Sequence, residues 1–284
     1  MTLDQATGDQ AHGVSPEDIR ANVDDLYRDG ITARKGAFSV GWVDELAKDV
    51  EAAFQEARSR PDGAVGRGPQ RWYVEVHPEQ LRGFVDLVTH PWITAVSRAV
   101  LGDDYRIVEV GFDLPLAGAV NQPWHRDFAM PATTREQHRL DSLAFNLTLV
   151  DTTPDMGPFE IAPGTQWDDD PSFLHGMFPD RSSYPRYESL AQRKLPQRGD
   201  VSARSALTIH RGTANHSQRP RPVLVLGVVA GDEVSAIEHS MAVTRPYWES
   251  LPTELRAHLD CPVVDELVPI TQRHTIEGLV MGDA

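Results

Sequence analysis

The chain of 284 residues has a single cysteine, Cys261, so no disulfide can form within it. Its apolar runs fall well short of the roughly 20 residues that a membrane-spanning helix needs. Its N-terminus lacks the apolar segment of a secretory signal. A repeat period and a Gly/Ser-rich or Pro-rich linker are also missing. These absences predict a cytoplasmic protein that forms one domain over residues 1–284.

Positive charge is also scarce in this chain. Its 27 Lys and Arg residues stand against 42 Asp and Glu residues, which gives a formal net charge of −15. Nucleic acids and anionic membranes attract basic surfaces, so neither is an expected partner. With 40% hydrophobic residues the chain can bury a substantial core. We therefore expect a monomer or homodimer whose partner is a small molecule.

Two histidines and one aspartate form the most informative pattern that is present. His125 and Asp127 are two positions apart, so on a strand their side chains leave the same face and can hold one ion together. The third ligand must come from a strand distant in sequence, and His210 meets that demand. Two imidazoles and a carboxylate form the facial triad of non-haem Fe(II), which leaves coordination positions open for chemistry. A His-x-Asp tripeptide also arises by chance among 11 histidines and 42 acidic residues, so the surrounding pattern decides.

The segment before His210 is typical of a strand over residues 201–209. In its alternation Arg204 and His210 share one face, which is expected to look into a site. His216 is the rival ligand, but it lies in a turn-like run. The sequence therefore favours His210.

Helical patterns come first in the chain and strand patterns second. Apolar stripes at helical spacing predict N-terminal helices within residues 15–60, packed on the outside of a barrel. Alternating apolar residues at 108–114 and 143–149, and an apolar run at 223–229, predict an antiparallel core within residues 105–235. The predicted fold class is mainly β with flanking α-helices. We expect a double-stranded β-helix, the jelly-roll or cupin-like barrel, with the metal near its open end.

Four segments of the chain resemble, in order, segments of one known family. They are Asp29-Gly-Ile-Thr-Ala-Arg-Lys-Gly-Ala-Phe38, Gln122-Pro-Trp-His125-Arg-Asp127, Asp151-Thr-Thr-Pro-Asp-Met-Gly157-Pro-Phe-Glu-Ile-Ala-Pro163-Gly164-Thr165, and a distal block with Gly199-Asp200, His210-Arg-Gly212, Asn215-His-Ser217 and Arg219-Pro-Arg221. Four segments in the right order are far more specific than any one alone. By this resemblance the chain is similar to the phytanoyl-CoA dioxygenase family of iron and 2-oxoglutarate oxygenases. Gln166 departs from the pattern, since the family usually has a histidine there.

The resemblance implies Fe(II) as the cofactor, with 2-oxoglutarate and O2 as co-substrates. It makes His125, Asp127 and His210 the iron ligands and catalytic residues. It also implies hydroxylation of an unactivated C–H bond in a small metabolite, such as a natural-product intermediate. Because related halogenases lack the carboxylate ligand, Asp127 favours hydroxylation over halogenation. Desaturation, ring closure and epimerisation use the same oxidant and stay open.

The resemblance further makes Arg221 the partner of the distal carboxylate of 2-oxoglutarate. A guanidinium offers a planar fork that binds a carboxylate through two hydrogen bonds. Arg219 would share its face on an extended segment, so alternation alone leaves both arginines open. Gly212 stands where some relatives have a serine that touches the co-substrate, so a neighbouring hydroxyl is expected to replace it. The remaining candidates for co-substrate contact are Gln122, Thr213 and Ser217.

Candidates for the substrate pocket combine donors for an anionic group with apolar walls. They are Arg71, Trp72, Arg126, Met130, Trp167 and Arg204. For each of them, packing or surface pairing is the alternative role. Residues 166–198, rich in Asp, Pro, Ser and aromatics, are interpreted as an insertion that closes over the substrate as a lid. The alternative is a small cluster packed against the barrel wall.

Two other functions stay open. A non-catalytic jelly-roll that binds a small ligand or a metal would be expected to lose an iron ligand or the arginine, and the sequence keeps both. A cupin-like metal enzyme independent of 2-oxoglutarate would carry a closely spaced His-x-His with a following Glu, and these are not found. Release of succinate on adding iron, oxygen and 2-oxoglutarate would separate these functions.

Overall fold

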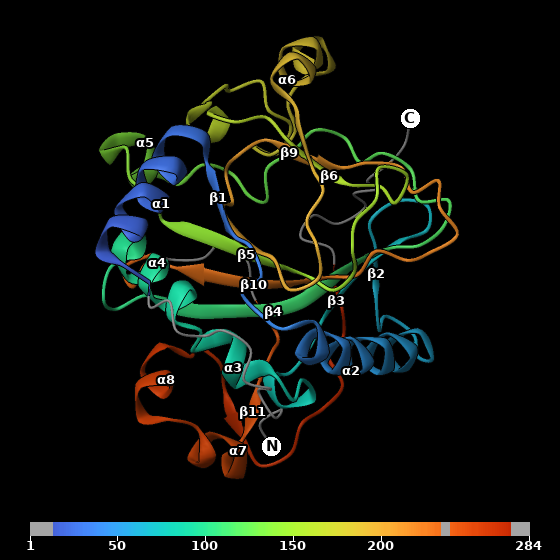
Figure 1. Cartoon of the computed structure of the whole chain (residues 1–284), viewed down its shortest axis with the longest axis vertical. Helices are drawn as coiled ribbons and strands as arrows, with labels where there is room; N and C mark the ends of the chain where they lie inside the picture. Colours follow the sequence, from blue (N-terminus) through green and yellow to red (C-terminus); the bar gives the residue numbers. More distant parts are fainter. Residues whose placement is uncertain (1–13, 234–238, 274–284) are drawn as a thin grey trace.

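A seven-stranded antiparallel sheet is the largest element of the structure, a computed structural model that describes residues 14–233 and 239–273. Its strands run in the order β1-β8-β5-β10-β4-β3-β2 (Figure 1). Their bounds are β1 Ile31–Arg34, β2 Val65–Gly66, β3 Arg71–Glu75, β4 Arg106–Pro115, β5 Ser142–Thr148, β8 Val201–Ser205 and β10 Val223–Val229. Most neighbours in this sheet come from distant parts of the chain, which is typical of a jelly-roll.

A second, three-stranded sheet lies on one side of the first, with the order β7-β6-β9 (Figure 1). Its strands are β6 Phe159–Ile161, β7 Gln192–Lys194 and β9 His210–Gly212. The segment around His125 extends this sheet, because His125 and His210 form an isolated antiparallel bridge. The two sheets together form the double-stranded β-helix, so the predicted fold class is confirmed.

Strand β5 illustrates how the sequence assigns the two faces of the larger sheet. Phe145 and Leu147 are buried in the main hydrophobic core. Ala144 and Asn146 alternate with them and line a cavity on the opposite face. The apolar face is covered by helices, while the other face looks toward the smaller sheet (Figure 1).

The helices that cover the apolar face include α1 and α2, both within residues 15–60. The helical segments are α1 Pro16–Asp29, α2 Val40–Arg58, η1 Pro78–Gln80, α3 Phe84–Val88, α4 Pro91–Leu101, α5 Ala132–Gln137, η2 Thr165–Trp167, η3 Arg181–Ser183, α6 Tyr184–Leu190, α7 Arg245–Ser250 and α8 Thr253–His258, where η marks a 3-10 helix. Helix α1 begins with a capping box, in which Ser15 Oγ accepts from the Asp18 N–H at 3.0 Å. It ends at Gly30, whose φ of +73° lets the chain turn directly into β1. A side chain at Gly30 would collide with the Thr208 hydroxyl, so this turn lies against the segment that leads to His210.

The C-terminal part forms a small unit beside α3 (Figure 1). Its strands, β11 Val243–Thr244 and β12 Val263–Val264, pair in parallel. Among the described residues, no helix has the length and apolar character needed to cross a membrane.

Residues 166–198 contain both a loop and a piece of the barrel. Strand β7 pairs with β6 and so belongs to the smaller sheet. Phe173 and Tyr187 pack with Trp124 and Ile209 in a second core cluster. This part of the segment therefore forms the wall cluster that the sequence left as the alternative to a lid.

Candidate active site

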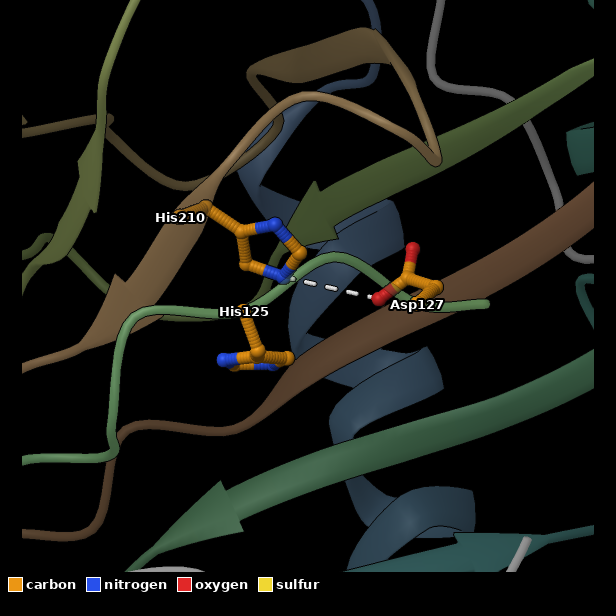
Figure 2. A group of neighbouring side chains, drawn as sticks. All are labelled: His125, Asp127 and His210. Atoms are coloured by element: carbon orange, nitrogen blue, oxygen red, sulfur yellow. Dashed lines mark ion pairs between the residues drawn. The ribbon is translucent and has the colours of Figure 1, made fainter. Parts of the chain in front are cut away.

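Three side chains, His125, Asp127 and His210, converge between the two sheets. Their possible ligand atoms all lie within 4.8 Å of one another. The His210 ring is directed at the Asp127 carboxylate, with Nε2 3.5 Å from Oδ1 (Figure 2). Two backbone hydrogen bonds, of 3.0 and 2.8 Å, join His125 to His210 and hold the two ligand segments in register. Within the described ranges, no other cluster of His, Cys, Asp and Glu has this arrangement.

Each imidazole is oriented through its second nitrogen. Nδ1 of His125 lies 2.8 Å from the Pro123 carbonyl oxygen, and Nδ1 of His210 lies 2.8 Å from the Thr208 carbonyl oxygen. Because a carbonyl only accepts, each Nδ1 carries the proton and each Nε2 keeps its lone pair for a metal. The donor set therefore fits an iron ion with three open positions.

The electrostatics of the triad favour the same ligand form. Burial lowers the pKa of His125 to about 4 and lowers the pKa of His210 well below its ordinary value, so both rings are neutral at neutral pH. Burial alone would raise the pKa of Asp127, but the Arg204 guanidinium and the two imidazoles bring that pKa below its usual range. Nη1 of Arg204 donates to Asp127 Oδ2 at 2.7 Å. Arg204 thus keeps the carboxylate ionised and fixes its orientation.

A cavity of about 910 Å³ surrounds the triad and extends over the concave face of the larger sheet. Ala144 and Gly227, which are register partners on β5 and β10, are among the residues that line this space. Phe159 and Met177 supply apolar walls near the metal ligands. The ring of Phe178, from the loop before α6, stacks on His125 at a centroid distance of 5.9 Å.

The two candidate arginines for the co-substrate have different surroundings. Arg221 is buried, with 5% of its surface exposed, and lines the cavity. Arg219 does not line the cavity, and its Nη2 lies 3.6 Å from the sulfur of Met156. The alternation expected for an extended segment is thus broken between these two arginines, where a bend over residues 217–219 precedes Pro220. Of the two candidates, Arg221 is the one that lines the cavity shared with the triad.

Of the other expected co-substrate residues, only Gln122 lines the cavity. The side-chain oxygen of Gln122 accepts from the Gly212 N–H at 2.9 Å. Thr213 Oγ1 donates to the Pro158 carbonyl oxygen at 2.7 Å. Ser217 Oγ lies 2.7 Å from the side-chain oxygen of Asn215. Both hydroxyls therefore stabilise the loop after β9 and do not line the cavity.

Of the six substrate candidates, only Arg204 lines the cavity. The other five are Arg71, Trp72, Arg126, Met130 and Trp167. Trp167 stacks on His138 at a centroid distance of 3.7 Å, and its indole N–H donates to the Tyr27 carbonyl oxygen at 3.2 Å. It is thus held against the end of α1, which an isolated reading of its loop could not foresee.

Three of the remaining candidates have structural partners. The Arg126 side chain donates to the carbonyl oxygens of Gly176 and Asp168, each at 2.8 Å, and so holds the loop that carries Phe178. The guanidinium of Arg58 covers the ring of Trp72, with its central carbon 3.7 Å from the ring centroid. Arg71 forms an ion pair with Asp113, described below.

A second polar group in the cavity was largely missed from the sequence. Its members are Arg67, Tyr73, Glu75 and Glu109, which all line the cavity. The Tyr73 hydroxyl donates to Glu109, and the Arg67 guanidinium stacks over the Tyr73 ring at 4.1 Å. The cavity that this group lines is also lined by His125, Asp127 and His210. A signal existed, because Glu109 and Asp113 alternate with the apolar residues of the predicted strand.

Comparison with known proteins agrees with the geometry. The model of the phytanoyl-CoA dioxygenase (PhyH) family matches residues 26–223. Comparison with curated proteins gives no match.

Three solved structures share the fold. The epimerase SnoN in complex with Fe3+, alpha ketoglutarate and nogalamycin RO has a TM-score of 0.61 and 18% identity, covering 80% of this chain and 93% of that one. A second structure of SnoN, the non-heme alpha ketoglutarate dependent epimerase from nogalamycin biosynthesis, gives a TM-score of 0.60 with the same identity and coverage. The carbocyclase SnoK from the same biosynthesis gives 0.59 and 19% identity, covering 76% of this chain and 84% of that one.

Proposed function

We propose that this chain, which belongs to the phytanoyl-CoA dioxygenase (PhyH) family, hydroxylates an unactivated C–H bond of a small metabolite. Its family and the meeting of the His125, Asp127 and His210 side chains make it an iron- and 2-oxoglutarate-dependent oxygenase. The observation that carries this proposal is that one nitrogen of each imidazole and one carboxylate oxygen lie within 4.8 Å of one another. When bound there, iron supplies the activation of dioxygen, with 2-oxoglutarate as the source of the electrons. The protein must then hold, orient and shield the reactants.

Particular residues are proposed to perform these tasks. Arg221 receives the distal carboxylate of 2-oxoglutarate, because it is the buried guanidinium that lines the cavity at this end. Arg204 keeps Asp127 in one orientation, so one carboxylate oxygen stays directed at the metal position. Gln122 orients the Gly212 backbone beside it.

The loop between η2 and α6 is proposed to act as the lid over the site. Met177 lines the cavity and Phe178 stacks on His125, while Phe173 anchors the loop in the wall cluster. An apolar cover excludes water while a reactive oxidant is present. The lid is thus narrower than the whole of residues 166–198, since β7 in that range is a strand of the barrel.

The cavity wall supports a substrate with both polar and apolar parts. Tyr73, Glu109 and Arg67 offer hydrogen-bonding groups, and Phe159 offers an apolar surface. The nogalamycin biosynthesis in which SnoN and SnoK act supports a natural-product intermediate as the substrate. Their activities also support a second candidate, in which the same site performs epimerisation or ring closure in place of hydroxylation.

The test is to incubate the purified chain with Fe(II), 2-oxoglutarate and oxygen and to measure succinate, with Asp127→Ala as the control. We expect succinate release from the wild type alone, increased by a true substrate. The mass of the product then separates the two candidates, since hydroxylation adds one oxygen, epimerisation leaves the mass unchanged and ring closure removes two hydrogens. Absence of succinate from the iron-loaded wild type would favour a binding protein without turnover.

A further inference from the structure

Arg71 and Arg221 flank strand β4 at the same point. Arg71 is the register partner of Pro115 on one side. On the other side, the Arg221 N–H donates to the Pro115 carbonyl oxygen at 3.1 Å. Both side chains are buried, with exposed fractions of 1% and 5%. Two guanidinium groups therefore meet at the end of the cavity where the co-substrate carboxylate is proposed to bind.

The carboxylate of Asp113, on β4, lies between these two arginines. Arg71 Nη1 donates to Asp113 Oδ2 at 2.9 Å, and Arg221 Nη2 lies 4.0 Å from the same oxygen. Burial first, and then the charge of Arg71, lower the pKa of Arg221 to about 10, although the charge of Asp113 acts in the opposite direction. Two cations against one anion leave a positive charge uncompensated, which is unfavourable in a buried place. One carboxylate from a ligand would balance the group.

The group also contains unpaired donors that an anionic ligand would use. Nε of Arg221 and Nε of Arg71 are buried and have no hydrogen-bond partner within the described part of the chain. Buried polar atoms in proteins are almost always paired, so such exceptions call for a missing partner. The free Nε leaves Arg221 able to present two parallel N–H groups to a carboxylate.

The guanidinium of Arg71 also reaches the smaller sheet. Its Nη2 donates to the Thr213 carbonyl oxygen at 3.0 Å. The guanidinium of Arg71 packs against Gly212, because a Cβ atom at position 212 would lie only 2.5 to 2.7 Å from three guanidinium atoms. Gly212 and His210 are two residues apart on β9 and therefore face the same side of the strand. The positive charge of Arg71, which lies against Gly212, is thus close to the iron ligand His210. The buried position of the Arg71 guanidinium thus requires a residue without a side chain at position 212.

We propose that Arg71 is a positioning residue for the co-substrate. Together with Asp113 it holds Arg221 in place, and it supplies the second positive charge that the distal carboxylate of a 2-oxo dicarboxylate neutralises. Gly212 leaves the space that this arrangement needs. The inference rests on the proposed role of Arg221 in the oxygenase site.

Calorimetric titration of 2-oxoglutarate into the Fe(II)-loaded chain under anaerobic conditions tests the proposal. Arg71→Gln should bind 2-oxoglutarate roughly 10- to 100-fold more weakly, as expected when one charge is removed from a desolvated charge group. Arg71→Lys should recover much of this loss, because it restores the charge without the fork. Fe(II) affinity should stay unchanged in both variants. 2-Oxopentanoate, which lacks the distal carboxylate, should bind wild type and Arg71→Gln equally.

A double-mutant cycle with Gly212→Ser provides the second measurement. In the wild type the added side chain must displace the guanidinium, so 2-oxoglutarate affinity should fall. In an Arg71→Ala background the space is free, and the same substitution should have little further effect. Arg139→Gln is the matched control, because it removes the partner of the buried Asp141 outside the cavity and should leave 2-oxoglutarate affinity unchanged.

The outcomes separate this inference from the proposed function. If the wild type binds 2-oxoglutarate and Arg71→Gln binds it equally well, Arg71 is only a tie between the sheets and the inference is wrong. Equal losses of 2-oxoglutarate and 2-oxopentanoate affinity would contradict it in the same way. If the Fe(II)-loaded wild type does not bind 2-oxoglutarate at all, the proposed function fails and the inference fails with it.

Discussion

Both ends of the cavity contain a buried arginine paired with an aspartate, yet the two pairs have opposite surroundings. At the metal end, Arg204 binds one oxygen of Asp127, and the other oxygen lies beside the Nε2 lone pair of His210, so two acceptor atoms face the same space. At the arginine end, Asp113 is shared by two arginines and keeps one oxygen unpaired. The first end is built for a cation and the second for an anion. In the proposed function, this difference orients an asymmetric co-substrate between the two ends.

The largest effect is expected from a substitution that removes a ligand at the metal end of the cavity. His210→Ala should abolish Fe(II) binding, because the site loses one of three ligands and the geometry cannot be completed from the loop. His216→Ala is the matched control and should bind Fe(II) as the wild type does. Equilibrium dialysis with Fe(II) under anaerobic conditions measures both. Loss of iron from the His216 variant with retention by the His210 variant would show that the ligand set is wrong.

The next largest effect is expected from a substitution at the arginine end of the cavity. Arg221→Leu should weaken 2-oxoglutarate binding by about 1.5–3 kcal/mol for each charge-assisted hydrogen bond lost, with Fe(II) still bound. Arg219→Leu, two residues away and outside the cavity, should leave 2-oxoglutarate affinity near that of the wild type. The dependence of succinate release on 2-oxoglutarate concentration measures both variants. An equal loss in the two variants would move the binding role away from Arg221.

A smaller effect concerns the lid rather than either end. Phe178→Ala should raise the ratio of succinate released without substrate to succinate released with substrate oxidation by several-fold. The reason is that water gains access to the site beside His125. Phe173→Ala removes the same ring from the anchor of this loop in the wall cluster, so it should lower the unfolding temperature and raise uncoupled succinate release less than Phe178→Ala does. Comparing succinate with oxidised product gives the coupling ratio. A normal ratio in the Phe178 variant would exclude this loop as the cover of the site.

The smallest effect is expected from the hydroxyls of the loop after β9. Thr213→Val removes a buried hydrogen bond to the Pro158 carbonyl oxygen and should cost about 1 kcal/mol of unfolding free energy. Because this hydroxyl does not line the cavity, 2-oxoglutarate affinity should be unchanged. Urea denaturation and calorimetry measure the two quantities separately. A fall in affinity with unchanged stability would restore the role of a co-substrate ligand.

The sequence predicted the features that depend on local pattern. Alternation along residues 143–149 assigns the two faces of β5, and the i, i+2 spacing of His125 and Asp127 places both on one side of their segment. The fold class follows from such patterns together with the family motifs. These features survive because they need no knowledge of which strands are neighbours.

The cavity wall could not be predicted in the same way, because it depends on the packing of segments distant in sequence. Trp167 was a reasonable pocket candidate by composition, but contacts with Tyr27 and His138 hold it elsewhere. The sequence alone suggests Arg71 as a donor to the substrate, whereas the sheet register buries it against Asp113 and Gly212. Only the pairing of β3 with β4 and the approach of β9 reveal this, and neither can be read from any single segment.

Calorimetric titration of 2-oxoglutarate into the chain, with and without Fe(II), tests the contrast between the two ends most directly. Tight binding should require both the metal and Arg221. Removal of Fe(II), or Asp127→Ala, should weaken binding from the metal end, and Arg221→Leu should weaken it from the arginine end. Binding that is equally tight without Fe(II) and in the Arg221→Leu variant would contradict the proposed roles of both ends.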